Sequence, residues 1–233
     1  MISVCMATYN GEKFIKDQLD SIINQLDELS EIIIVDDFST DMTTSIIESI
    51  NDNRIILLKN QKNLGVVLSF EKAIRNSKNE IVFLCDQDDI WLENKVKKIL
   101  QNFQNNKEIS LIFGNGILID EKGTHLGRNL FKNKVYDSFI RHLIQPRFLG
   151  CSIAFKKSFE NKIFPFPKSI PMHDWWIGMN HIAYGKVKYL DEPLIKYRRH
   201  ENTVTTGKNA PLPTMIYWRY KILINFIINY FKK

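Results

Sequence analysis

The chain has 233 residues, 44% of them hydrophobic, and carries a formal net charge of +6 with an isoelectric point near 9.1. This composition excludes an intrinsically disordered chain and suits one hydrophobic core with at most a small appendage. The three cysteines are odd in number and widely spaced, which argues against a disulfide framework and favours reduced thiols in the cytoplasm. The basic balance suits an anionic partner such as a nucleotide sugar, a nucleic acid or an acidic lipid surface.

Short apolar stretches alternate with amphipathic stretches from residue 1 to about residue 120. We expect strands at about 2–7, 31–36, 54–59, 80–85 and 109–115, and helices at about 13–26, 41–50, 66–76 and 91–105. Ser39 or Asp41 is expected to cap the second helix. This alternation is typical of βαβ units and predicts an α/β fold with a mostly parallel central sheet flanked by helices. Because the crossovers are right-handed, the carboxyl ends of the strands should meet at one edge.

The fourth expected strand ends in three carboxylates, Asp86, Asp88 and Asp89. In an extended segment Asp86 and Asp88 point to the same side, so both can face one cation or one sugar. Mg²⁺ and Mn²⁺ prefer oxygen ligands of this kind and commonly bridge to substrate phosphates. Alternatively, Asp88 or Asp89 caps the helix that is expected to begin near Trp91. The residue pattern leaves both interpretations open.

Two other expected strands end in polar loops, at residues 7–12 and 35–39. Neither loop contains a G-x-G-x-x-G or Walker sequence, so a dinucleotide-binding fold and a P-loop enzyme are not supported. A phosphate group would have to be held in another way, and a metal ion on the acidic cluster would do so.

Beyond about residue 120 the alternation loosens, and prolines punctuate shorter elements. We expect a strand at 150–155, a helix beginning at 172–179, and a strand–turn–strand segment over 187–200. Asp174 lies in the first turn of that helix, where an acid either caps the helix or faces a ligand. Two tryptophans follow it, and stacked aromatic rings beside an acid often form a sugar-facing wall. His200 is either a metal or phosphate ligand or an ordinary structural histidine.

The last segment, residues 214–233, combines aromatic and isoleucine residues with four cations and no acid. Its uninterrupted apolar run is too short for a membrane span. An amphipathic helix at a membrane interface fits the pattern, and so does a helix packed on the domain or on a second copy of the chain, as in a homodimer. Elsewhere basic residues do not cluster with aromatic ones, so no nucleic-acid partner is expected.

Six motifs follow one another along the chain. They are Ala-Thr-Tyr-Asn-Gly-Glu (7–12), Val-Asp-Asp (35–37), Asn-Leu-Gly (63–65), Asp-Gln-Asp-Asp-Ile-Trp (86–91), Gly-Cys (150–151) and His-Asp-Trp-Trp (173–176). In this order the six motifs resemble glycosyltransferase family 2. The resemblance covers residues 1 to about 206 and implies the GT-A fold, with a Rossmann-like sheet. The acidic motif and the His-Asp-Trp-Trp motif, followed by Tyr-Arg-x-His, are most similar to bacterial rhamnosyltransferase-type members, which usually build surface polysaccharides.

The resemblance also implies roles for individual residues. A nucleotide diphosphate sugar donor would be bound by Ala7, Thr8, Tyr9, Asp36, Asp37, Asn63, Gly65, Asp86 and Gln87. Mn²⁺ or Mg²⁺ would be held by Asp88, Asp86 and His200, and Asp174 would be the catalytic base. The acceptor side would include Gly150, Cys151, His173, Trp175 and Trp176. The sequence departs from the family pattern after residues 63–65, where a basic residue is often found, and at His173, where a glutamate is common.

The implied reaction is an inverting, metal-dependent transfer of a hexose to a hydroxyl of a glycan or lipid-linked glycan. The donor would be dTDP-rhamnose, or alternatively a UDP-hexose. Residues 1–206 would form the GT-A domain, with a nucleotide-sugar-binding part at 1–120 and an acceptor-side part at 121–206, followed by a basic aromatic helical tail at 207–233. The protein would work in the cytoplasm, peripherally on the inner face of the membrane. A non-catalytic carbohydrate-binding protein on the same fold is the alternative.

Overall fold

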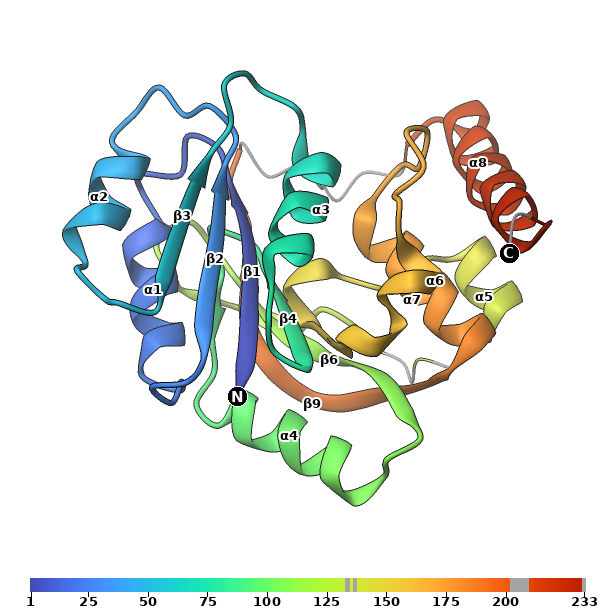
Figure 1. Ribbon diagram of the computed structural model, residues 1–233, viewed down its shortest axis with the longest axis horizontal. Helices are drawn as coiled ribbons and strands as arrows, with labels where there is room; N and C mark the ends of the chain where they lie inside the picture. The colour runs from blue at the N-terminus through green and yellow to red at the C-terminus, as the bar shows by residue number, and fades with distance from the viewer. Residues whose placement is uncertain (133–134, 136–137, 202–209, 232–233) are drawn as a thin grey trace.

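A single sheet of nine strands runs through the computed structural model, which describes residues 1–132, 135, 138–201 and 210–231 (Figure 1). One half contains β3 (Ile55–Lys59), β2 (Glu31–Asp36), β1 (Ile2–Thr8) and β4 (Ile81–Cys85), all paired in parallel. The other half continues from β4 through β8 (Ile153–Lys156), β6 (Ile109–Ile119), β9 (Lys186–Arg198) and β5 (Ile90–Trp91), with β7 (His125–Asn129) paired to β6. Since β8 and β5 run antiparallel to their neighbours, the sheet is mixed rather than mostly parallel.

Helices cover both faces of the sheet. Helices α1 (Ile15–Ile23), α2 (Thr43–Ser49) and α4 (Lys95–Asn105) pack on one face, and α3 (Val66–Asn76) and α7 (His173–Tyr184) pack on the other. Successive residues of a strand point to opposite faces. Val4 and Met6 therefore belong to the core on the side of α1, α2 and α4, and Cys5 belongs to the core on the side of α3 and α7. Burial on both faces explains why these strands are continuous apolar runs in the sequence.

Some expected elements differ from the observed ones. Trp91 lies in β5 rather than in a helix, and α4 begins only at Lys95, after Asn94 in a left-handed conformation with φ of 64°. The acids at 88 and 89 are therefore too far from this helix to cap it. The second helix starts after Met42, and the Asp41 carboxylate accepts a hydrogen bond from the Thr43 amide at 3.0 Å.

The acceptor-side elements also differ. Residues Gly150–Ser152 form a 3₁₀ turn, η1, so the strand expected from residue 150 begins at Ile153. The two strands expected over 187–200 are one strand, β9, in which Pro193 stands opposite Asn115 at an irregularity of the pairing. Proline lacks the amide hydrogen that a regular ladder needs, and a bulge accommodates this.

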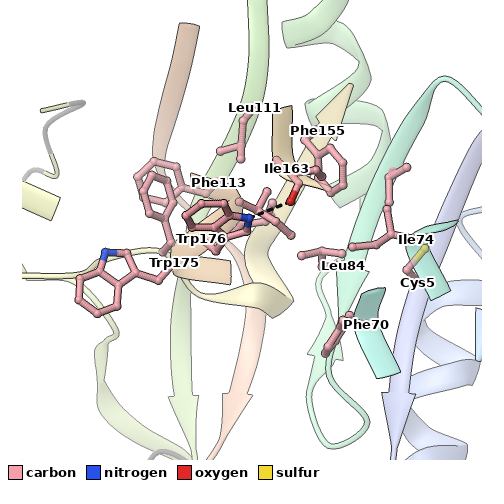
Figure 2. Close-up of a cluster of buried hydrophobic side chains, with 14 of the residues drawn as sticks. Cys5, Phe70, Ile74, Leu84, Leu111, Phe113, Phe155, Ile163, Trp175 and Trp176 are labelled. Atoms are coloured by element: carbon pink, nitrogen blue, oxygen red, sulfur yellow. Dashed lines mark hydrogen bonds between the residues drawn. The ribbon is translucent and has the colours of Figure 1, made fainter. Parts of the chain in front are cut away.

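Trp175 and Trp176 lie in the core beneath α7 (Figure 2). Trp176 is fully buried, and its Nε1 donates a hydrogen bond to the Ile163 carbonyl at 2.8 Å. Trp175 is 4% exposed, and its Nε1 donates to the His142 carbonyl at 3.1 Å. The expectation that the two indoles form a sugar-facing wall is therefore wrong, because both rings are buried in the core.

The carboxyl-terminal helix α8 (Leu212–Phe231) packs beside α5 (Phe139–Ile144) and α7 (Figure 1). Two further short elements, η2 (Lys157–Phe159) and α6 (Glu160–Ile163), follow β8 in the chain. Ile222 of α8 is fully buried. The Phe226 ring lies 5.2 Å from that of Phe139 and 5.7 Å from that of Tyr184, measured between centroids. Helix α8 is thus attached to the domain along one side. Among the described residues, no helix is long and apolar enough to cross a membrane.

The attachment of α8 can be tested with two substitutions on the same helix. Ile222→Ala should lower the free energy of unfolding by about 2–4 kcal/mol, because it leaves a cavity in a packed core. Ile227→Ala, at a side chain that is 42% exposed, should cost at most about 0.5 kcal/mol. Urea unfolding followed by circular dichroism measures both. Equal costs for the two variants would contradict the observed orientation of α8.

Candidate active site

A cavity of about 890 Å³ opens where β1, β2 and β4 end. Strand pairing brings these ends together, because Thr8 is opposite Asp36 and Met6 is opposite Cys85. The wall includes most residues that the sequence motifs single out, namely Ala7, Thr8, Tyr9, Asp37, Asn63, Gly65, Asp86, Gln87, Asp88, Gly150, His173, Asp174 and His200. Its size is typical of a site for a small ligand. Residues scattered over the whole domain therefore meet in one cavity.

Four of the expected site residues lie outside the described wall of the cavity. They are Asp36, Cys151, Trp175 and Trp176. The Asp36 carboxylate accepts hydrogen bonds from Thr8 Oγ1 at 3.1 Å and from the Ser39 amide at 2.9 Å, so it braces the loop after β2. The Cys151 thiol is fully buried, and this burial raises its pKa well above the ordinary value. Direct ligand contacts by these residues therefore do not agree with the structure.

Asp37 lies in the wall of the cavity and fixes the loop of residues 60–65 there. Its Oδ1 accepts hydrogen bonds from the Leu64 amide and from Asn60 Nδ2, and its Oδ2 accepts one from the Gly65 amide, each at 2.8 Å. Gly65 has φ of 87°, a conformation that favours glycine. A carboxylate offers about four acceptor positions, so Oδ2 retains one for a donor group of a ligand.

The loop of residues 86–89 after β4 is called the acidic loop below. Gln87 connects it to the loop after β1. Its Oε1 accepts a hydrogen bond from the Tyr9 amide at 2.9 Å, and its Nε2 donates to the Tyr9 carbonyl at 3.1 Å. A Cβ atom on Gly11 would lie 2.3 Å from Gln87 Oε1, so the glycine makes this contact possible. Gln87 is thereby committed to the backbone, whereas the Tyr9 side chain is 47% exposed and free to contact a ligand.

The end of β9 is tied to the acidic loop through Arg198 and Asp89, which are both buried. Asp89 Oδ1 accepts a hydrogen bond from the Arg198 amide at 2.9 Å. The Arg198 guanidinium donates to the Asp88 carbonyl at 2.8 Å and to the Glu121 carbonyl at 2.7 Å, and it lies over the Phe14 ring. These contacts place the residues after β9 against the acidic loop.

As a result, His200 Nε2 lies 2.8 Å from Asp88 Oδ2 beside the cavity. An imidazole nitrogen and a carboxylate oxygen at this separation are suitable partners for one divalent cation. Asp86, Asp89 and Cys151 form another close group of potential ligands. Asp89 is already bonded to Arg198, and a buried neutral thiol suits Mg²⁺ or Mn²⁺ poorly. The geometry therefore favours Asp88 and His200, with Asp86 beside them, as residues that could hold a hard cation.

Negative charge is concentrated at this point of the cavity. Burial, and then the charges of Asp89, Asp88 and Asp174, raise the pKa of Asp86 well above its ordinary value. Burial and the charge of Asp88 raise the pKa of Asp89 to about 7. Carboxylates crowded in this way favour the uptake of a cation or a proton.

Asp174 stands in the first turn of α7 and lines the cavity. Its Oδ2 accepts a hydrogen bond from the Gly150 amide at 3.0 Å, and its Oδ1 accepts one from the Trp175 amide at 2.6 Å. Burial raises the pKa of its carboxyl to about 6, although both amides oppose this change. An ionised carboxylate with a pKa close to neutral is well suited to accept a proton.

His173, next to this acid, stacks on Phe70 with 3.9 Å between ring centroids. Burial lowers the pKa of His173 to about 3, so its ring is neutral. Neither ring nitrogen has a hydrogen-bond partner among the described residues. A buried histidine on the wall of a cavity with unpaired nitrogens is suited to bind a polar group of a ligand.

The positions of two buried cations near the acids could not be predicted from the sequence. Arg198 stands in the Tyr-Arg-x-His motif, but its bond to a loop 110 residues earlier becomes visible only in the fold. Lys95 is fully buried beneath the acidic loop, where its Nζ donates to the Cys151 carbonyl at 2.7 Å. Burial lowers the pKa of Lys95 to about 8. Neither its spacing nor its neighbours in the sequence distinguish Lys95 from the surface lysines.

Comparison with known proteins identifies relatives over most of the chain. The model of the family described as Glycosyl transferase family 2 matches residues 3–164. An uncharacterized glycosyltransferase of Methanocaldococcus jannaschii is 32% identical over an alignment of 211 residues, which covers 85% of this chain and 70% of that protein. The UDP-Glc:alpha-D-GlcNAc-diphosphoundecaprenol beta-1,3-glucosyltransferase WfgD of Escherichia coli is 24% identical over a gapped alignment of 235 positions, which covers 98% of this chain and 87% of that protein.

Solved structures share the fold at low sequence identity. S. aureus TarS, crystallised with UDP-GlcNAc, matches with a TM-score of 0.76 and 20% identity over 98% of this chain and 66% of that chain. The mannosyltransferase PcManGT from Pyrobaculum calidifontis, in complex with GDP-Man and Mn²⁺, matches with a TM-score of 0.64 and 18% identity over 95% of this chain and 68% of that chain. This likeness confirms the expected GT-A-like α/β fold, with a curled mixed sheet, flanking helices and a carboxyl-terminal helix.

The contact between Gly11 and Gln87 can be tested with a double-mutant cycle. Gly11→Ala should displace the Gln87 amide and lower the free energy of unfolding by about 1–2 kcal/mol, the net worth of two hydrogen bonds. In a Gln87→Ala background the same change should cost little, because the group that it displaces is gone. Urea unfolding of all four proteins measures the coupling. Fully additive costs would contradict the proposed role of Gly11.

Proposed function

The chain belongs to glycosyltransferase family 2, and from this premise we propose that it is an inverting, metal-dependent hexosyltransferase acting on a glycan or lipid-linked glycan. The observation that carries the proposal is that one cavity contains both the Asp174 carboxylate and the Asp88–His200 pair. The first supplies a base for the acceptor hydroxyl, and the second a place for the cation that accompanies a diphosphate.

Asp174 takes the proton of the acceptor hydroxyl as that oxygen attacks the anomeric carbon. Its carboxylate is oriented by the Gly150 and Trp175 amides, so its geometry is fixed before the substrate binds. Its pKa of about 6 leaves it ionised at neutral pH while keeping it more basic than an ordinary aspartate. The neutral His173 ring beside it offers a hydrogen bond to a sugar hydroxyl.

The donor lies across the ends of β1, β2 and β4. Tyr9 contacts the base, and the remaining acceptor position of Asp37 receives a base or ribose hydrogen. Asp88 and His200, with Asp86, would hold Mn²⁺ or Mg²⁺, and a cation there would supply positive charge opposite the diphosphate of the donor. Mn²⁺ in the related PcManGT structure supports this assignment.

The donor in this proposal is dTDP-rhamnose or a UDP-hexose, and the product is part of a bacterial surface polysaccharide. The printed name of WfgD, which describes a glucosyl transfer to a sugar on diphosphoundecaprenol, supports a lipid-linked acceptor. Residues 1–120 bind the donor, residues 121–206 face the acceptor, and 207–233 form the tail, with 202–209 and 232–233 outside the described residues. The enzyme works in the cytoplasm at the inner face of the membrane.

A non-catalytic carbohydrate-binding protein on the same fold is the second candidate. A binding protein would need neither an oriented base with a raised pKa nor a pair of residues placed to hold a cation. The presence of both in one cavity favours the enzyme. Slow hydrolysis of a donor by the purified protein, measured as nucleotide release, would separate the two candidates once thermal shift has identified the donor that stabilises it most.

The base assignment predicts how activity depends on pH. Below pH 6 the Asp174 carboxyl takes up a proton, so kcat/KM should fall about tenfold for each pH unit. Asp174→Asn should reduce transfer by about 10³-fold or more and remove this acidic limb, while the Kd of the donor stays within about threefold. Initial rates from pH 5 to 8 and calorimetry provide the two measurements. An unchanged limb in the variant would refute the assignment.

The metal assignment predicts a selective loss of metal-dependent donor binding. Asp88→Ala should weaken binding of the nucleotide diphosphate in the presence of Mn²⁺ by about 10²-fold and leave binding in EDTA nearly unchanged. Glu93→Ala is the matched control, because this exposed acid follows the same loop outside the cavity. Isothermal titration calorimetry measures both. Equal Mn²⁺ dependence in Asp88→Ala and the wild type would exclude Asp88 as a ligand.

A further inference from the structure

Helix α8 is apolar on two opposite sides. One side carries Ile222 and Phe226, which pack on the domain. The other side is exposed and consists of Leu212, Ile216, Tyr217, Tyr220, Leu223, Ile227 and Ile228. Successive members of this set are one, three or four residues apart and follow the outward stripe of the helix. The outward face of an ordinary surface helix is polar, so this composition requires a partner.

Helix α5 enlarges the exposed face. Ile140 is 67% exposed and Ile144 is 63% exposed. The two helices are in contact, because the Arg219 guanidinium donates a hydrogen bond to the Ile144 carbonyl and Phe139 packs on Phe226. The seven outward residues of α8 together with Ile140 and Ile144 are called the α5–α8 surface below. An exposed apolar area of this extent is typical of a binding surface.

The charges around the α5–α8 surface are almost all positive. Arg141 belongs to α5, and Lys162 of α6 extends over the ring of Tyr184, which stacks on Phe226 of α8. The one acid in the sequences of α5 and α6 is Glu160, which lies 4.0 Å from Lys157. Residues 210–231 contain Arg219 and Lys221 and no acid. Lys221 extends over the rings of Tyr217 and Tyr220, with Nζ 5.1 Å and 6.0 Å from their centroids. Apolar residues with tyrosines and lysines at their edge are typical of a helix in a lipid interface.

We propose that the α5–α8 surface docks on an anionic membrane, with α8 lying parallel to the lipid surface and its outward side buried between the headgroups. The apolar side chains leave water, the tyrosines place ring and hydroxyl at the boundary, and Lys221 reaches the phosphates. The surrounding cations add attraction to anionic lipids that is not available from neutral ones.

A second copy of the chain fits this surface less well. Pairing about a two-fold axis would bring the same surface of two copies together. The flanking cations of both copies would then face each other, and the sequences of α5 and α8 contain no acid to pair with them. Like charges at the edge of an interface oppose association, whereas anionic lipid headgroups match them.

The docking has a consequence for the active site, which rests on the proposed function. Phe226 of α8 packs against Trp176 and Tyr184 of α7, and the first turn of α7 carries Asp174. The base and the docked helix thus belong to one packed unit. A lipid-linked acceptor would reach the cavity from the membrane on which α8 rests.

The test uses vesicles of phosphatidylglycerol with phosphatidylcholine, and of phosphatidylcholine alone, in flotation with the full chain. The wild type should float with the anionic vesicles and much less with the neutral ones. A variant with Tyr220→Ser, Leu223→Ser and Ile227→Ser should bind the anionic vesicles at least about tenfold more weakly than the wild type. Its melting temperature should stay within a few degrees of the wild type, because Ile222 still attaches the helix.

The matched control carries Leu29→Ser, Met42→Ser and Leu126→Ser, which are exposed apolar residues elsewhere on the molecule and should leave flotation unchanged. Flotation of the outward-face variant equal to that of the wild type would overturn the proposal. The proposal would also be overturned if the wild type did not bind the vesicles and formed a dimer in light scattering that this variant did not form. Donor hydrolysis in solution, measured in parallel, reports on the proposed function separately, since it needs no membrane.

Discussion

Two hydrogen bonds between the end of β9 and the loop of residues 86–89 hold the cavity together. Asp89 accepts one from the Arg198 amide, and the Arg198 guanidinium donates the other to the Asp88 carbonyl. Together with the pairing of β5 and β9, they place the end of β9 against this loop and His200 beside Asp88. A buried guanidinium and a buried carboxyl are costly unless their polar atoms are paired. Here backbone groups pair the guanidinium and Asp89 Oδ1, whereas Asp89 Oδ2 has no hydrogen-bond partner among the described residues. The loop after β1 is fixed in a similar way, since Gln87 bonds to the backbone of Tyr9. A ligand therefore meets walls that are already in position.

Much of this architecture could be predicted from the sequence, for a physical reason. The parallel strands are buried on both faces, so their apolar runs are unmistakable, and polar residues directly after them must lie at one edge of the sheet. The positions of Asp86, Asp88 and Asp174 on the cavity follow from this pattern and from the family motifs. The antiparallel half of the sheet is less evident, because β5 has two residues and β9 contains a proline.

The remaining features depend on contacts between distant residues. Helix α7 is buried on nearly all sides, so the sequence around Trp175 and Trp176 gives no indication of which residues face the cavity. Adjacent acids are also ambiguous: Asp36 braces a loop and Asp37 lines the cavity, although both follow the same strand. The pairing of Arg198 with a loop 110 residues away depends on the fold as a whole. Spacing along the chain specifies none of these relations.

The raised pKa of Asp174 also affects the stability of the protein. In the folded chain the Asp174 carboxyl has a pKa of about 6, whereas the ordinary pKa of an aspartate is 3.8. Folding is therefore less favourable at neutral pH, where the carboxylate is ionised in both states, than below pH 3.8, where it is protonated in both. The difference, acquired as the pH rises from 3.8 through 6, is about 3 kcal/mol. The burial that raises the pKa of this carboxyl thus lowers the thermodynamic stability of the fold at neutral pH.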